Sequence, residues 1–392
     1  MQVSRAENDV LFCAGRRDVD CEQLRRVVQE VRDWDYLLNT AHSHGLVPLL
    51  QKHLHSVAAN LTPVDVLSKL KQESVANTQN VLHLLGRQLK VFRAFKENGI
   101  RVAVFKGSLL SQMAYGEGTL RQAGDIDVLI SRADFARTRT LLESLGYAMA
   151  PSLSAAHLAS HLRSHCEIQF VRDEWVTVVD LHWAFAPKNF VFKLDADEVL
   201  SRLQTVALAG TNIETLATED LIVYLSMHGA KHLWRALEWI TSLGELIRAA
   251  EAIDWDVVVA RAEQSHATRM LALGLRFIKT VSQIEIPLLV LKTLDADASA
   301  KKLAEQVLAQ MFVDAGAQLS AETNLHNFKI MDRKRDALVS ALRAVFVPTL
   351  TDWDALHLPA SLHSLYYAYR PLRLSKVYSN SLWRKLSSRG AA

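Results

Sequence analysis

The spacing of apolar residues divides the chain into three stretches. Over residues 1–99 apolar side chains recur every three or four positions, most clearly in residues 20–34 and 65–99. This spacing places them on one face of a helix, and Gly99 follows as a typical helix stop. The same helical spacing returns after about residue 215 and continues toward the end. The pattern therefore predicts all-helical regions over residues 1–99 and 213–392.

Between these regions, over residues 100–212, short β-branched runs replace the helical pattern. We expect strands at residues 100–105, 126–130, 166–171 and 176–183, with helices at 109–115 and 132–145. Strands that alternate with short helices favour an α+β class with a small mixed sheet. The sequence thus predicts a compact α+β core embedded between the two helical regions.

Composition narrows the class of protein. Hydrophobic residues make up 49% of the chain and charged residues 22%, as in ordinary globular proteins. Three cysteines without a CxxC pair predict no disulfide framework. The first residues do not resemble a signal peptide, and no apolar run reaches the length of a membrane span. We expect a cytoplasmic protein without membrane contact, and a net charge of +3 gives no ground for a nucleic-acid partner.

Three aspartates stand where apolar residues are expected. Asp125 and Asp127 lie at the entrance of the strand at 126–130, and alternation places them on one face. Asp180 interrupts the apolar run "VTVVDLHW". An isolated Asp-x-Asp pair is compatible with two solvated residues, but an acid inside an apolar strand is poorly placed for solvation alone. Three carboxylates on neighbouring strands can share divalent cations, which predicts a metal site.

Polar residues around the first strand suit a phosphate group. Lys106, Gly107 and Ser108 form a turn between a strand and a helix, and Arg121 lies in the loop before Asp125. A glycine there lets the backbone approach a phosphate, and the following N–H groups point at the anion. These residues are appropriate for a site that binds a nucleoside triphosphate.

The motifs resemble one family. The segments "FKGSLL", "YGEGTLRQAGDIDVLI", "VVDLHWAF" and "DLIVYLSMHGAKHLWRALEWI" look like the bacterial uncharacterised nucleotidyltransferase family, within the DNA polymerase beta-like nucleotidyltransferase superfamily. That family is often encoded beside genes for polysaccharide or modified-peptide biosynthesis. The resemblance implies transfer of a nucleoside monophosphate from NTP to a hydroxyl or phosphate of a small-molecule, peptide or protein acceptor. A non-catalytic module that senses NTP or scaffolds a complex is the alternative.

The resemblance also implies roles for single residues. Asp125, Asp127 and Asp180 would hold Mg²⁺ or Mn²⁺, and Asp180 would also serve as the base. The β- and γ-phosphates would lie on Gly107 and Ser108. Lys106 and Arg121 would supply positive charge to the nucleotide.

Two groups of histidines have a spacing of four residues. The first group is His157, His161 and His165, and the second is His228 and His232. The spacing is compatible with zinc, but a zinc site needs further ligands and no HExxH motif occurs. We interpret them as polar helix faces. His182 shares a strand face with Asp180 and is therefore a candidate contact at the site. His165 is kept as a second candidate contact. The basic segment after residue 354 predicts a docked helix with a frayed end.

Overall fold

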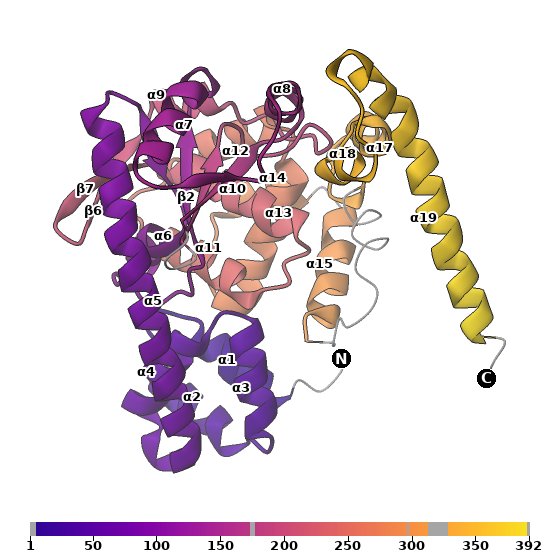
Figure 1. The fold of residues 1–392 in the computed structure, drawn as a ribbon. Helices are drawn as coiled ribbons and strands as arrows, with labels where there is room; N and C mark the ends of the chain where they lie inside the picture. Colours follow the sequence, from indigo (N-terminus) through magenta and orange to yellow (C-terminus); the bar gives the residue numbers. More distant parts are fainter. Residues whose placement is uncertain (1–4, 173–176, 296–297, 313–327, 390–392) are drawn as a thin grey trace.

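The computed structural model describes residues 5–172, 177–295, 298–312 and 328–389. Its N-terminal part is helical, as predicted, and ends in the 34-residue helix α5, which runs along one side of the molecule (Figure 1). Gly99 follows α5 with a positive φ of 61°, a conformation that glycine adopts freely. The elements here are α1 (Ala6–Ala14), α2 (Cys21–Gln29), α3 (Trp34–Ser43), α4 (Val47–Val57), η1 (Ala59–Leu61) and α5 (Val64–Glu97).

The central part contains a five-stranded mixed sheet in the order β1-β2-β5-β4-β3. The pair β2·β5 is parallel, and the pairs β1·β2, β5·β4 and β4·β3 are antiparallel. The α+β class and the small mixed sheet are thus confirmed. The strands are β1 (Val102–Val104), β2 (Asp125–Ile130), β3 (Ala148–Ala150), β4 (Glu167–Arg172) and β5 (Thr177–His182).

Helices and a hairpin accompany this sheet. The predicted helix at 132–145 divides into a 3₁₀ turn and a helix, and the one at 109–115 begins two residues earlier, at Gly107. The strand β3 and a separate β6·β7 hairpin were not predicted, and Val176, the first residue of the last expected strand, lies outside the described residues. The elements are α6 (Gly107–Tyr115), η2 (Arg132–Asp134), α7 (Phe135–Ser144), α8 (Ala155–Ser164), α9 (Ala196–Ser201), β6 (Gln204–Leu208) and β7 (Thr211–Thr215).

The C-terminal part is helical, as predicted. Its last helix, α19, extends away from the rest of the molecule (Figure 1). No helix in the described ranges is long and apolar enough to cross a membrane. The elements are α10 (Thr218–Lys231), α11 (Leu237–Ala249), α12 (Trp255–Gln264), α13 (Thr268–Phe277), the π-helix η3 (Ile278–Ser282), α14 (Leu288–Asp295), α15 (Ala298–Gln310), α17 (Lys334–Phe346), α18 (Leu350–Ala355), η4 (Ala360–Leu365) and α19 (Tyr366–Arg389).

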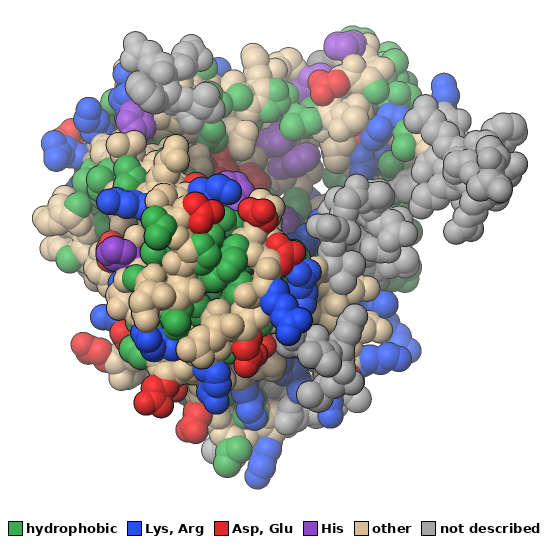
Figure 2. Space-filling model, turned by 90° about the horizontal axis from the view of Figure 1, so that it is seen from below, with side chains coloured by type: hydrophobic (Ala, Val, Ile, Leu, Met, Phe, Trp, Pro, Cys, Tyr) green, Lys and Arg blue, Asp and Glu red, His purple; other side chains and the backbone are tan. Residues whose placement is uncertain are grey.

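Two hydrophobic cores hold these parts together. The smaller one joins one face of the sheet to the second half of α5, with Phe92 and Phe95 packed near Ile126 and Val128. The larger core combines residues of the N-terminal helices with residues of α10, α11 and α13. The two helical regions, which are far apart in sequence, therefore share one interior. Basic and acidic side chains are interspersed on the face viewed from the N-terminal helices (Figure 2).

Helix α19 is held at its start by ion pairs. Asp352 in α18 accepts from Arg370 Nη1 and from Arg373 Nε, each at 2.6 Å. Arg370 also donates to the Ala344 carbonyl at the end of α17. The beginning of the basic C-terminal segment is therefore docked, as predicted.

Candidate active site

Two of the predicted acids lie side by side at the centre of the sheet. Asp127 in β2 is paired in register with Asp180 in β5. Because these strands are parallel, side chains of paired residues point to the same face. Ligand atoms of Asp127, Asp180 and His182 all lie within 4.8 Å of one another. Asp180 and His182 follow Asp127 by 53 and 55 positions in sequence, and the pairing of β2 with β5 brings the three residues together.

Asp127 is the most enclosed member of this cluster. Its side chain is 2% exposed, and its Oδ1 atom accepts from Lys106 Nζ at 2.6 Å and from His182 Nε2 at 3.0 Å. Burial alone would raise the pKa of Asp127, but the Lys106 ammonium and His182 hold it below its usual range. Asp127 is therefore ionised across the neutral pH range.

The other two carboxylates have the opposite electrostatic balance. Burial, with the nearby Asp127 charge, raises the pKa of Asp125 to about 6 and shifts the pKa of Asp180 upward as well. Asp180 Oδ1 is buried and has no hydrogen-bond partner among the described residues. Such an orphaned carboxylate oxygen costs free energy unless a proton or a cation satisfies it.

Lys106 and Gly107 shape the turn that approaches these acids. Gly107 has φ 58° and begins α6, and a Cβ atom built there would meet the Asp125 carbonyl at 3.8 Å. Ser108 follows in the first turn of α6 and is 5% exposed. The free N–H groups of the first helical turn therefore begin beside β2. This is the strand-to-helix turn that the sequence predicted, although Lys106 is paired with Asp127 in the absence of a ligand.

His182 connects the cluster to an acid that sequence reasoning did not select. Its Nδ1 atom lies 3.0 Å from Glu167 Oε2, while its Nε2 atom contacts Asp127. Glu167 is opposite His182 in the antiparallel β4·β5 register, so the two side chains share the face of the site. The alternation of β4 could have indicated Glu167, but only the register shows which residue it faces. His182 thus orients Asp127 through a carboxylate–imidazole–carboxylate chain.

Arg121 lies in the loop before β2 and has an ion-pair partner that the sequence did not reveal. It is 7% exposed and forms a buried ion pair with Glu238 in α11. Glu238 also packs against Gly45, where a Cβ atom would lie 2.2 Å from Glu238 Oε2. Arg121 therefore ties the loop before β2 to the C-terminal helices and the N-terminal helices. Its proposed role toward the nucleotide stays a prediction.

The loop that leads into β2 is fixed by α5. Asn77 Nδ2 donates to the carbonyl of Thr119, and Asn80 Nδ2 donates to the carbonyl of Ala123. Asparagines three positions apart lie on one helix face, so both reach the same loop. They position the backbone just ahead of Asp125.

A wall of aromatic and imidazole rings from α10 and α11 surrounds Lys106. Tyr224 packs edge-on against Phe105 at 5.1 Å, and its neighbour one turn further is His228. Trp239 packs against both His228 and His232, at 5.3 and 5.7 Å. Burial, with Lys106 among the nearby positive charges, lowers the pKa of both histidines, and that of His232 to about 4. The pair predicted as a polar face is thus a neutral wall beside the acids.

The other histidine stripe lies against the C-terminal helices. His157 is stacked between Trp353 and His363, at 4.8 and 4.4 Å, and His161 is stacked on His165 at 4.1 Å. His165 also pairs with Ser164 Oγ through its Nδ1 atom at 2.9 Å, and its expected role at the site stays a prediction. The stripe contacts other rings and joins α8 to α18 and η4.

A comparison of the sequence with family models identifies the class of protein, a nucleotidyltransferase, and the acid cluster fits a metal site of such a protein. The model of the uncharacterised nucleotidyltransferase family matches residues 30–283, well over half of the chain. The chain therefore belongs to the uncharacterised nucleotidyltransferase family. No curated protein matches it. The matched range includes the sheet, Lys106, the three aspartates and the wall of α10 and α11.

Proposed function

We propose that the protein is a metal-dependent nucleotidyltransferase that transfers a nucleoside monophosphate from an NTP to an acceptor hydroxyl or phosphate. One observation carries the proposal. Asp127 and Asp180 converge in register beside the first turn of α6, and a buried Asp180 oxygen has no hydrogen-bond partner in the part of the chain that the structure describes. The family match supports the same class of reaction. The acceptor would be a small molecule, peptide or protein.

The donor set fits a divalent cation such as Mg²⁺ or Mn²⁺. Carboxylate oxygens are the ligands these ions prefer, and a cation would satisfy Asp180 Oδ1 and relieve the repulsion that raises the pKa of Asp125. Asp125, Asp127 and Asp180 would hold the metal, with His182 positioning Asp127. When bound, the metal ions would neutralise charge on the attacking and leaving oxygens.

The remaining groups of the chain bind and orient the substrates. The N–H groups at Gly107 and Ser108 would receive the β- and γ-phosphates at the start of α6. Lys106, released from Asp127, would neutralise phosphate charge. An acceptor oxygen forms a bond to the α-phosphorus, the bond from that phosphorus to the bridging oxygen breaks, and pyrophosphate leaves. Asp180 takes the acceptor proton, in keeping with its raised pKa.

The first experiment measures metal-dependent nucleotide binding. Titration of the protein with a non-hydrolysable NTP and Mn²⁺ should give saturable binding that Asp125→Ala and Asp127→Ala abolish while circular dichroism stays unchanged. Glu97→Gln, an exposed acid at the end of α5, is the matched control and should bind like the parent. Tight metal-dependent binding by both aspartate variants would overturn the assignment.

The second experiment separates an enzyme from a nucleotide sensor. Release of pyrophosphate from NTP is followed over a panel of sugar, peptide and protein acceptors. An enzyme releases pyrophosphate with at least one acceptor class and incorporates the labelled α-phosphate into it. A sensor or scaffold would bind the nucleotide and show no turnover.

A further inference from the structure

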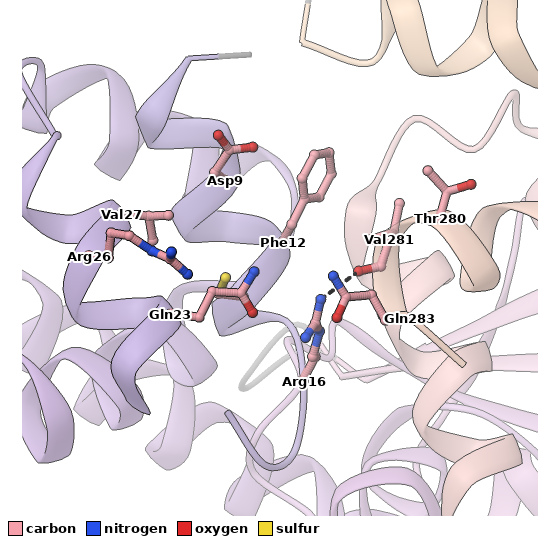
Figure 3. Close-up of a pocket in the computed structure, with 10 residues that line it drawn as sticks. Asp9, Phe12, Arg16, Gln23, Arg26, Val27, Thr280, Val281 and Gln283 are labelled. Carbon is pink, nitrogen blue, oxygen red and sulfur yellow. Dashed lines mark hydrogen bonds between the residues drawn. The ribbon is translucent and has the colours of Figure 1, made fainter. Parts of the chain in front are cut away.

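A polar pocket lies away from the sheet, where the N-terminal helices meet the C-terminal ones (Figure 3). Its volume is about 340 Å³, within the range of sites for small molecules. The helices α1 and α2 form one wall, and the π-helix η3 with the residue after it forms the other. Its polar lining consists of Asp9, Arg16, Gln23, Arg26, Thr280 and Gln283.

Arg16 supplies a buried positive charge with one unused donor. The residue is 8% exposed, and its Nη2 atom donates to the Val281 carbonyl at 3.2 Å. Among the described residues, its Nε atom is buried and has no hydrogen-bond partner. A donor left buried and unpaired is costly. An oxyanion beside the guanidinium would compensate its buried charge.

A second guanidinium approaches the same space. Arg26 extends from α2 toward the centre of the pocket, while Arg16 enters from below it (Figure 3). Two guanidinium groups that face one cavity repel each other. The pocket also contains the Asp9 carboxylate, so its formal charge is +2 from the arginines and −1 from Asp9. The sum of +1 favours a negatively charged ligand.

The wall opposite the arginines has an uncommon backbone. The segment from Ile278 to Ser282 is a π-helix, and Gln283 after it has φ 54° without being glycine. Arg248 Nη2 holds the turn by donating to the Ser282 carbonyl at 2.8 Å. Both features cost free energy and recur at functional sites. Here they place Gln283 beside the pocket, while the Thr280 hydroxyl donates to the Arg276 carbonyl at 3.0 Å.

We propose that this pocket binds a small molecule through a phosphate or carboxylate group. The arginines and the Gln283 amide would bind this anionic group. None of the lining residues belongs to the sheet or to the acid cluster. The proposal therefore stands whether or not the proposed nucleotidyl transfer is correct.

The test is calorimetric titration of the full chain with glycerol 3-phosphate and, in a separate series, with lactate. These two probes distinguish a phosphate from a carboxylate as the preferred group. Arg26→Gln changes an exposed residue, and Gln283→Gly fits the positive φ without strain, so both variants should fold. We expect each to weaken binding of the preferred probe at least about tenfold, the effect of losing one charged or polar contact.

The controls separate this pocket from the acid cluster. Arg93→Gln removes an equal charge from an exposed position on α5 and should leave binding unchanged. Asp127→Asn should also leave it unchanged, since Asp127 lies in the sheet. The proposal is overturned if neither probe binds saturably up to about 10 mM, the weak end of metabolite affinities. It is also overturned if Arg26→Gln and Gln283→Gly bind like the parent.

Discussion

The two faces of the strands β2 and β5 differ in almost every physical respect. On one face Ile126, Val128, Val179 and Leu181 are at most 1% exposed and pack in a core with α5. On the other face, Asp127, Asp180 and His182 form a charged cluster, with Asp125 at its entrance. One residue along the strand separates the two environments. The apolar face stabilises the fold. On the polar face, Asp125 and Asp180, whose pKa values are raised, cost free energy that a bound cation or proton recovers.

This contrast distinguishes positions that mainly determine the free energy of unfolding from positions that mainly determine the reaction. Substitutions on the apolar face should change the free energy of unfolding and leave the chemistry intact. Substitutions on the polar face should mainly change the chemistry, and one of them, at Asp125, should even stabilise the protein. The following four predictions test this division, beginning with the largest expected effect.

The largest effect is expected from Asp127→Asn. It removes the charge that pairs with Lys106 and His182 at the centre of the cluster. We expect nucleotidyl transfer to fall by about three orders of magnitude or more, as is typical when a group that stabilises transition-state charge is lost. The measurement is pyrophosphate release at saturating NTP and metal. A folded variant that retains more than about a tenth of the parent rate would contradict the role of this face.

On the apolar face, Leu181→Ala should destabilise the protein. Leu181 lies between Asp180 and His182 in sequence and is fully buried on the opposite side. Removing a buried leucine side chain typically costs about 2–5 kcal/mol of the free energy of unfolding. Urea denaturation measures this, with kcat expected to stay near the parent value. The control is Leu82→Ala, an exposed leucine at 53%, for which we expect a change within about 0.5 kcal/mol.

Asp125→Asn should stabilise the metal-free protein at neutral pH. The pKa of Asp125 is raised to about 6, so the folded state holds its proton more tightly than the unfolded state does. Stability is therefore lost as pH rises from about 4 to 6, and the amide avoids this loss. We expect a gain of roughly 1–3 kcal/mol at pH 7.5 and little change near pH 4. Urea denaturation at both pH values checks this. A loss of stability at pH 7.5 would contradict the assigned electrostatics.

The smallest expected effect is the pH dependence of metal binding. A cation binds the ionised carboxylate, so protonation of Asp125 below about pH 6 should compete with it. For one group of this pKa, the apparent affinity for Mn²⁺ should fall about tenfold between pH 7.5 and pH 5. Electron paramagnetic resonance of free Mn²⁺ gives the bound fraction. Equal affinity at both pH values would show that Asp125 is not a ligand.

Local sequence chemistry predicted several details correctly. The sequence Asp-Trp-Asp occurs three times, beginning at Asp33, Asp254 and Asp352. An aspartate before a tryptophan at a helix start can cap the first-turn N–H groups. Asp33 caps α3 by accepting from the Tyr36 N–H, and Asp254 caps α12 by accepting from the Val257 N–H. At the third occurrence Thr349 is the cap, and Asp352 lies within the first turn. Thr349 precedes Asp352 by three positions and supplies the capping side chain. Asp352 accepts from the Thr349 N–H and forms ion pairs with the arginines of α19.

Other parts of the structure were beyond the reach of the sequence pattern. The strand β3 has the sequence Ala-Met-Ala, which lacks β-branched residues, and it exists because β4 offers a free edge. Glu167 was overlooked because its partner His182 is fixed by strand register alone. The ion pair of Arg121 with Glu238 was not foreseen, because nothing near Arg121 in sequence reveals a partner 117 residues further on.

The sequence by itself determined the class of the fold, the order of the helical and mixed regions, and the strand positions of Asp125, Asp127 and Asp180. These follow from hydrophobic period and from polar residues at apolar positions, which are local properties of the chain. Only the tertiary structure decided that Asp127 and Asp180 lie side by side, since strand register sets the distance between them. It also decided that the two terminal helical regions share one core with an arginine-lined pocket between them. Those outcomes depend on packing between distant segments, where burial free energy outweighs any local preference.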